Sequence, residues 1–276
     1  MVMRVLRTEL YKRLLSLGLT EQSAGLEATE LACLAAGIRR DRYIFEADRE
    51  HTLLRDPEEL ISRRAQGEPL AYILGEWDFY GLTLKTDRRA LIPRDDSVCV
   101  LELFLSRLSP RAERILDLCT GTGCLGLAAA LHRPGLSVTL GDISSDALAL
   151  AEENIALLGL GDRVRTVRAN ALLPPEFEPG SFHGMICNPP YLCRDELSPT
   201  PEPILALDGG EDGLDFYRSV SALWKKALAP GSPLCFEVGY TQSADVSGIM
   251  AGEGFEDITV ERDLSGIERA VCGIKK

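Results

Sequence analysis

The residues from Ile115 to Gly126, ILDLCTGTGCLG, read as a short buried strand, a glycine-rich turn and the start of a helix. The helix continues in the apolar residues from Leu125 to His132. Three glycines in the turn have G-x-G-x-x-G spacing: Gly121, Gly123 and Gly126. Glycine allows positive φ and close approach of the backbone, so the turn is suited to contact a nucleotide-like cofactor. The glycines alone fit both NAD and S-adenosylmethionine.

Strands and helices alternate through the rest of the chain. Further strands are expected over residues 138–142, 164–167, 182–187 and 234–238, and helices over 145–158, 214–228 and 243–251. The last two strands, 258–262 and 269–274, have no helix between them and predict an antiparallel hairpin. This order predicts an α/β fold in which helices cover both faces of a mostly parallel sheet. Many S-adenosylmethionine-dependent methyltransferases have such a terminal hairpin, so we expect a Rossmann-like class I methyltransferase sheet.

The first 70 residues show helical periodicity and little strand signal, as at Leu10, Leu14 and Leu17. Asp56-Pro57-Glu58-Glu59 is a helix start, with proline in the first turn and acids near the positive end of the helix dipole. We therefore expect a small helical domain over residues 1–70. A hairpin linker over 71–93 and a methyltransferase domain over 94–276 complete the predicted organisation.

Composition limits the partners. The 276 residues are 45% apolar and 26% charged, and no apolar stretch approaches the roughly 20 residues of a membrane helix. The N-terminus lacks a signal-peptide core, so we expect a cytosolic chain. The net charge of −12 counts against DNA or RNA as a direct substrate, because phosphate contacts require a basic face. We expect a monomer with no nucleic-acid or membrane partner.

Eight cysteines raise the possibility of metal or disulfides. Cys119 and Cys124, which flank the glycine turn, just fit the spacing of a zinc-binding pair, but Cys187 and Cys193 are too widely spaced. A zinc site would need two well-spaced pairs, so the sequence does not predict one. Four others lie singly in apolar surroundings: Cys33, Cys99, Cys235 and Cys272. We expect reduced, buried thiols and no metal. The three scattered histidines, His51, His132 and His183, are assigned no catalytic role.

Two acids lie near the ends of the first two strands of the sheet, one before the glycine turn and one after the helix that follows it. Asp142 ends the second strand, where a carboxylate can accept the protons of two ribose hydroxyls. The alternative is that Asp142 caps the next helix, although Ser144 or Ser145 could do so equally well. Asp117 is expected to orient the glycine loop or the amino-acid end of the cofactor.

The segment Ile186–Cys193, ICNPPYLC, ends a strand on two prolines. The prolines fix their φ angles and hold Asn188 and Tyr191 in place at the carboxyl edge of the sheet, beside the cofactor. A planar NH₂ group fits this arrangement. Asn188 and the carbonyl of Pro189 can accept its two N–H groups, while Tyr191 offers a flat face. The motif predicts methyl transfer to an amide or exocyclic amine and leaves glutamine, adenine and cytosine open; a plain strand stop is the alternative.

A series of motifs in order resembles the release factor glutamine methyltransferases. The series comprises GEPLAYILGEWDFYGL (67–82), LIPR (91–94), DLCTGTG (117–123), NPPY (188–191), EPILALDGGEDGLDFYR (202–218) and RDLSGIERAV (262–271). The resemblance implies methylation of the glutamine N5 in the Gly-Gly-Gln motif of class I peptide chain release factors. The methyl donor is S-adenosyl-L-methionine, the product is S-adenosyl-L-homocysteine, and the N-terminal domain helps to hold the protein substrate.

The same resemblance implies the site residues. The cofactor site comprises Asp117, Cys119, Thr120, Gly121, Thr122, Gly123, Asp142, Asn170, Ala171 and Asn188. The catalytic and substrate-binding residues are Asn188, Pro189, Pro190 and Tyr191.

The sequence departs from the family pattern in two places. Asp95-Asp96-Ser97 stands where the family usually has Pro-Glu-Thr, and Asn170 stands where it usually has Asp. Ala171 supplies no ring beside the adenine. Three other functions stay open: a glutamine methyltransferase of a ribosomal protein, an adenine-N6 nucleic-acid methyltransferase, and a non-catalytic cofactor-binding module.

Overall fold

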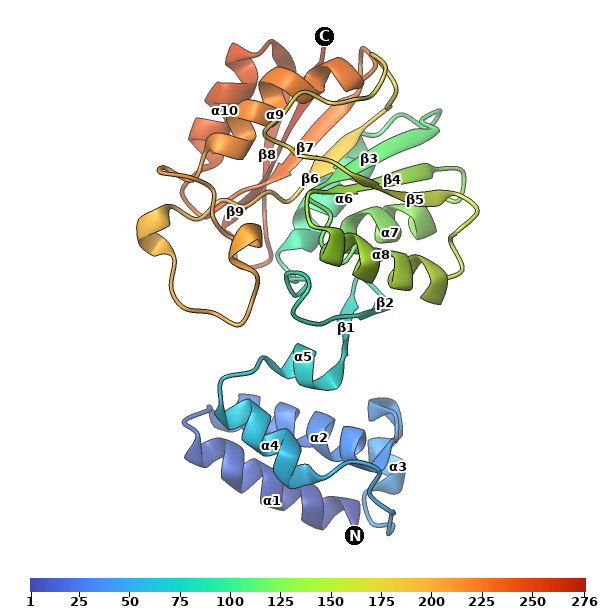
Figure 1. Cartoon of the computed structure of the whole chain (residues 1–276), viewed down its shortest axis with the longest axis vertical. Coiled ribbons are helices and arrows are strands. Elements are labelled where there is room, and N and C mark those ends of the chain that lie inside the picture. Colours follow the sequence, from blue (N-terminus) through green and yellow to red (C-terminus); the bar gives the residue numbers. More distant parts are fainter. The chain divides into compact units, whose positions relative to one another are not determined.

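The computed structural model describes all residues, 1–276, and divides the chain into two compact units, Met1–Glu76 and Trp77–Lys276 (Figure 1). None of the helices combines the length and the apolar character that crossing a membrane requires.

The first unit is helical, as predicted. Its helices are α1 (Met3–Ser16), α2 (Glu21–Ala36), α3 (Tyr43–Glu46), α4 (Pro57–Ala65) and α5 (Leu70–Leu74), with a 3₁₀ turn, η1 (Arg40–Arg42). Leucines of α1 pack against the alanine-rich face of α2, whose small side chains allow a close approach of the two helices. Asp56 caps α4 by accepting a hydrogen bond from the backbone N–H of Glu58, with Pro57 in the first position.

The stretch after α4 contains the expected hairpin and one unexpected helix. The hairpin pairs β1 (Glu76–Phe79) with β2 (Leu82–Lys85), and its two turn residues, Tyr80 and Gly81, have φ angles of 48° and 80°. Positive φ at both positions is typical of the type I′ hairpin turn. Leu70–Leu74 is helical and ends at Gly75, where φ is 79°. The hairpin therefore begins only at residue 76.

The second unit is built on a seven-stranded sheet of order β5-β4-β3-β6-β7-β9-β8. The strands are β3 (Arg114–Leu118), β4 (Ser137–Asp142), β5 (Val164–Arg168), β6 (Met185–Cys187), β7 (Pro233–Glu237), β8 (Phe255–Arg262) and β9 (Glu268–Lys275). Strands β3 to β7 pair in parallel, and β9 is antiparallel to both of its neighbours. The predicted fold class is confirmed. The strand order reverses between β3 and β6, which places a ligand crevice at the carboxyl ends of these strands.

Helices cover both faces of the sheet. One face packs against α6 (Ser97–Arg107), α7 (Cys124–His132) and α8 (Ser145–Leu157), and the other against α9 (Asp215–Leu223) and α10 (Ser243–Gly252) (Figure 1). Side chains alternate between the faces along each strand, as Ile115 and Leu116 of β3 show. Helix α6 was not expected from the sequence, although Val100, Leu101 and Phe104 form an apolar stripe at helical spacing.

Two other boundaries differ from the prediction. Strand β6 begins at Met185 rather than at residue 182, because Phe182 makes only an isolated bridge to Leu228. The helix expected over residues 214–228 ends as an α-helix at Leu223 and continues as a 3₁₀ turn, η4 (Trp224–Ala227). Both differences lie at the end of the strand or helix distant from the cleft described below.

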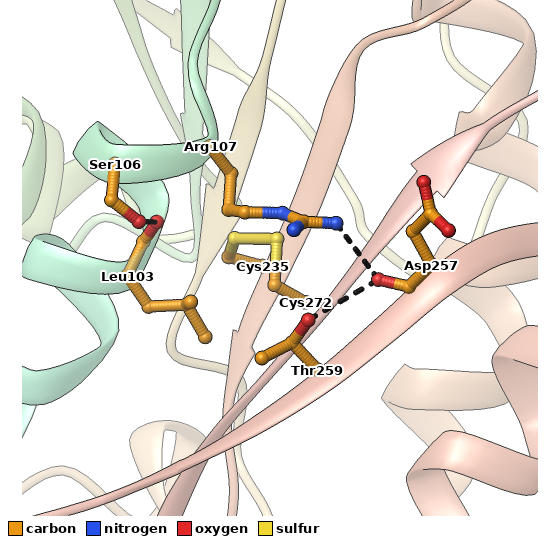
Figure 2. Close-up of a disulfide and its surroundings, with 7 residues drawn as sticks. All are labelled: Leu103, Ser106, Arg107, Cys235, Asp257, Thr259 and Cys272. Carbon is orange, nitrogen blue, oxygen red and sulfur yellow. Dashed lines mark hydrogen bonds between the residues drawn. A yellow bond between two sulfur atoms is a disulfide. The ribbon is translucent and has the colours of Figure 1, made fainter.

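The expectation of reduced cysteines is wrong for two of the eight. Cys235 of β7 and Cys272 of β9 are direct partners in the antiparallel pairing, 4.1 Å apart at Cα, and form a disulfide (Figure 2). It lies on the face of the sheet that α6 covers, near Leu103 and Arg107 of that helix. The pairing register brings together positions 37 residues apart, which sequence spacing does not reveal. The other six cysteines are free thiols.

Candidate active site

The glycine loop between β3 and α7 has the strained backbone that its sequence predicts. Cys119, Gly121 and Gly123 have φ angles of 61°, 54° and 85°. A Cβ atom on Gly123 would lie 3.0 Å from the side chain of Leu127, so glycine is required for both conformation and space. The positive φ at Cys119 is uncommon for a residue with a side chain and marks a constrained loop.

Asp117 lies beneath this loop and is fully buried. Its Oδ2 accepts hydrogen bonds from the Thr120 hydroxyl at 2.6 Å and from the backbone N–H of Gly126 at 2.9 Å, while Oδ1 has no partner. Burial raises the pKa of this carboxyl to about 7. Asp117 therefore ties the loop to the first turn of α7, and it does not line the cleft.

Asp142, at the end of β4, holds the loop from the other side. Its Oδ2 accepts from the Gly121 N–H and its Oδ1 from the Ser144 N–H, each at 2.9 Å. Burial raises the pKa of Asp142. Ser144 caps α8 by accepting from the N–H of Ala147, so the helix-cap role considered for Asp142 belongs to Ser144. Each Asp142 oxygen keeps acceptor capacity for a ligand.

These residues surround a cleft at the carboxyl ends of β3, β4 and β6. Nine predicted site residues line it: Cys119, Thr120, Gly121, Thr122, Asp142, Asn170, Ala171, Asn188 and Pro190. Four predicted site residues do not line it: Asp117, Gly123, Pro189 and Tyr191. The structure thus brings most of the predicted site together around one hollow.

The cleft also has walls that the sequence analysis did not assign. One is formed by residues 89–94, which include the LIPR motif. Glu202 holds this segment in place: its carboxylate forms an ion pair with Arg94 and accepts from the backbone N–H of Ile92. Leu205 and the ring of Phe216 form another part of the lining.

Asn170 and Ala171 lie after β5. The Asn170 side-chain oxygen accepts the N–H of Leu172 at 2.9 Å, which shapes the turn. Ala171 is buried, and its carbonyl accepts from the Ser219 hydroxyl of α9 at 2.8 Å. The two residues form a fixed wall of the cleft, whose lining also includes Phe216.

The Asn-Pro-Pro-Tyr turn is clamped by Gln242 at the start of α10. The Gln242 Nε2 donates to the Tyr191 carbonyl at 3.0 Å and to that of Gly213 at 3.3 Å. A Cβ atom on Gly209 would lie 2.7 Å from the Tyr191 Cα, so the glycines of the 202–218 motif allow this loop to lie against the turn. Burial raises the pKa of Tyr191 to about 12, so its phenol is neutral near pH 7.

Glu237 ends β7 beside Asn188 and is 2% exposed. Burial raises the pKa of its carboxyl to about 7, although hydrogen bonds from Ser97 and Asn188 act in the opposite direction. The sequence analysis did not assign Glu237. The only indication of Glu237 in the sequence is a single acid at the carboxyl end of an apolar strand, LCFEV.

No group of three or more His, Cys, Asp or Glu side chains is arranged to hold a metal ion.

A mostly parallel sheet ending in an antiparallel pair, with a glycine loop and a strand-end acid facing one cleft, is the architecture of α/β methyltransferases. Residues 100–200 match the Methyltransferase small domain family, and residues 6–75 match the PrmC N-terminal domain. A solved methyltransferase from Pyrococcus furiosus has the same fold, with a TM-score of 0.54 at 18% identity over 71% of this chain and 90% of that chain.

Curated relatives identify the family within that class. Release factor glutamine methyltransferase of Clostridium acetobutylicum is 32% identical over 86% of this chain and 87% of its own length. The relative of the same name from Thermodesulfovibrio yellowstonii is 35% identical over 89% and 90%. The chain belongs to the release factor glutamine methyltransferases.

Proposed function

We propose that this enzyme methylates the side-chain N5 of the glutamine in the Gly-Gly-Gln motif of class I peptide chain release factors. The observation that carries the proposal is the position of Asn188. It lines the same cleft as the glycine loop and Asp142, from the end of the adjacent strand β6. The names of the relatives support a release factor as the substrate.

The cleft is suited to S-adenosylmethionine, which supplies the methyl group and leaves as S-adenosylhomocysteine. The loop Cys119–Gly123 offers a close backbone surface, and the oriented carboxylate of Asp142 can accept two ribose hydroxyl protons. Asn170 and Ala171 are proposed as the wall beside the adenine. Asp117 is proposed to act indirectly, through the hydrogen bonds that hold the loop.

The substrate amide is proposed to bind at the Asn-Pro-Pro-Tyr turn. The side-chain oxygen of Asn188, which lines the cleft, and the carbonyl of Pro189 accept the two N–H groups of the glutamine, and Tyr191 packs against the planar amide. Pro189 and Tyr191 lie outside the cleft lining, so the glutamine is proposed to approach Asn188 from their side of the turn. The chain supplies orientation rather than a strong base, because the amide proton can leave after the methyl group is transferred. Tyr191 is a poor base in any case, since its pKa is raised to about 12. Orientation of two reactants can lower a barrier by roughly 7–11 kcal/mol at best.

The N-terminal unit is proposed to contribute to holding the protein substrate. Ile44 and Phe45 of α3 are 83% and 66% exposed, an unusual exposure for two adjacent large apolar side chains. Arg42 lies over the Phe45 ring, at 5.5 Å from its centroid, so the same surface carries positive charge. A surface of this composition is suited to a protein partner.

The test is methylation of a purified release factor by this enzyme with S-adenosylmethionine, followed by intact and peptide mass analysis. The expected result is a gain of one methyl group on the Gly-Gly-Gln glutamine, absent in a release factor carrying alanine in place of that glutamine. If the release factor gains no methyl group and a ribosomal protein is methylated instead, the substrate is a ribosomal glutamine and the release factor proposal is wrong. Label in DNA or RNA would favour an adenine amine.

A further inference from the structure

Glu237 and Asn188 occupy equivalent positions at the ends of two paired parallel strands. Cys187 of β6 is in register with Phe236 of β7, so the next residue of each chain segment, Asn188 and Glu237, lies one step beyond this pair. Cys187 and Phe236 both face the core under α9 and α10. Because side chains alternate, Asn188 and Glu237 point to the opposite face, where α6 begins at Ser97.

The Glu237 carboxylate is buried and only partly hydrogen-bonded. The neighbouring side chains of Ser97 and Asn188 favour its charged form and lower its pKa, while its Oε2 has no hydrogen-bond partner. Its backbone is fixed independently of the carboxylate: the Tyr217 hydroxyl donates to the Glu237 carbonyl at 2.9 Å, and the residue pairs with Ala270 of β9. A buried carboxylate is costly, so its retention beside the proposed acceptor site requires an explanation.

The chemistry of the Asn188 side chain supplies that explanation. An amide has one oxygen that accepts and one NH₂ that donates, and the two are nearly identical in size and shape. If the NH₂ faced the cleft, it would meet the NH₂ of a glutamine substrate, donor against donor. An ionised carboxylate only accepts, so Glu237 can pair with the Asn188 NH₂ in a charge-assisted hydrogen bond and leave the Asn188 oxygen for the cleft.

We propose that Glu237 is a positioning residue that fixes the orientation of the Asn188 amide, so that the Asn188 oxygen faces the substrate nitrogen. This inference rests on the proposed function, because it assumes that Asn188 accepts a hydrogen bond from the substrate. It assigns no contact between Glu237 and substrate or cofactor.

The first test compares Glu237→Ala and Glu237→Gln with a control, Val271→Ala. Val271 is buried on β9 opposite Phe236 and faces the other core, so its truncation weakens the same part of the sheet without touching Asn188. We expect kcat for release factor methylation to fall about 10- to 100-fold in Glu237→Ala, the range for residues that orient a functional group. Glutamine keeps an oxygen that can accept, so Glu237→Gln should lose less. KM and the Kd for S-adenosylmethionine should stay within about twofold.

A pH profile separates orientation from packing. When Glu237 takes up a proton, with a pKa of about 7, its hydroxyl can donate to the Asn188 oxygen and favour the wrong orientation. We expect kcat of the wild type to fall below about pH 7 and the Glu237→Gln profile to lose this decline. The other titratable side chains in the electrostatic environment of Glu237 are Asp96, Arg269, Tyr191, Tyr217, Cys99 and Cys124. Burial raises the pKa of Tyr217 well above its ordinary value. Both cysteines and Tyr191 have pKa values raised to between about 11 and about 12.

A second readout needs no substrate, so it remains decisive even if release factors are not methylated. The side-chain NH₂ resonances of Asn188, identified by their loss in Asn188→Ala, should shift with a midpoint near pH 7 in the wild type and not in Glu237→Gln. Absence of this shift in the wild type would overturn the inference. So would an active wild type whose Glu237→Ala variant keeps kcat, or loses no more of it than Val271→Ala. An inactive wild type with the shift present would count against the proposed substrate alone.

Discussion

Glu202 and Arg94, 108 positions apart in the chain, form an ion pair beside the cleft. The Glu202 side chain is 11% exposed and also accepts the backbone N–H of Ile92, so one carboxylate fixes two points of the 89–94 wall. The pair joins the LIPR motif to the 202–218 motif. Each supplies cleft-lining residues, and each needs the other to hold its position.

Glu202→Ala should therefore weaken cofactor binding through a residue that does not line the cleft. Hydrogen bonds to a charged group stabilise by roughly 1.5–3 kcal/mol, so we expect the Kd for S-adenosylmethionine to rise about tenfold. Calorimetric titration measures it. Asp212→Ala is the matched control, since it breaks an ion pair with Arg218 in which both side chains are about half exposed. An equal loss in both variants would mean that net charge, not the wall, controls binding.

Asn188→Ala should separate the two halves of the reaction. Most of the cleft proposed to hold the cofactor is lined by other residues, so we expect S-adenosylmethionine binding to stay within about threefold of wild type. Methyl transfer should slow by about 10²–10³, the loss expected for a single oriented group, because the amide nitrogen loses one of its two proposed acceptors. Single-turnover methylation together with a binding titration checks both. If binding and transfer fall equally, Asn188 serves the cofactor instead.

Asp142→Asn should have the opposite effect: it should weaken cofactor binding and leave methyl transfer at saturating cofactor largely intact. One Asp142 oxygen would become an NH₂ group facing the backbone N–H of Gly121 or Ser144, which places donor against donor. We expect S-adenosylmethionine affinity to fall about 10- to 100-fold, with kcat at saturating cofactor much less affected. Asp146→Asn, an exposed acid in the first turn of the next helix, is the control. Unchanged affinity in Asp142→Asn would remove Asp142 from the cofactor site.

The residues of the candidate site that the sequence singled out carry local constraints. The glycines of the loop can be recognised in the sequence because glycine suits those backbone angles and close contacts. Asn188 can be recognised because two prolines follow it. The mostly parallel sheet followed from the alternation of strands and helices, and the antiparallel pair from the two strands that have no helix between them. Each of these signals is contained within a few consecutive residues.

The parts that it missed depend on contacts between distant segments. The pairing of Cys235 with Cys272 follows from the register of β7 with β9, and the burial of Glu237 follows from the start of α6 against β7. Helix α6 was missed because its apolar run VCVLELFL is compatible with either a strand or a helix. Only the packed structure decides between these possibilities.

The disulfide predicts a defined thiol count. Protein purified without reductant and alkylated after denaturation should carry six labels, and after reduction all eight cysteines of the sequence should react. Closing a loop with a separation of 37 residues stabilises the folded chain by about 3–4 kcal/mol in the chain-entropy estimate. Reductant should thus lower the free energy of unfolding of the wild type, but not that of Cys235→Ala. Eight labels without reductant would mean that the two thiols are only neighbours.

Asp117 and Glu237 together predict how stability varies with pH. Burial raises the pKa of each to about 7, from ordinary values of 3.8 and 4.5. Between those values and pH 7 the folded state binds protons that the unfolded state has released, so the free energy of unfolding should fall as pH rises through this window. Each group contributes at most about 1.4 kcal/mol per pH unit. Urea unfolding between pH 5.5 and 8 should show a shallower slope for Asp117→Asn and for Glu237→Gln, and the shallowest for the double variant. An unchanged slope in Asp117→Asn would mean that this carboxyl is already ionised in the fold at pH 5.5.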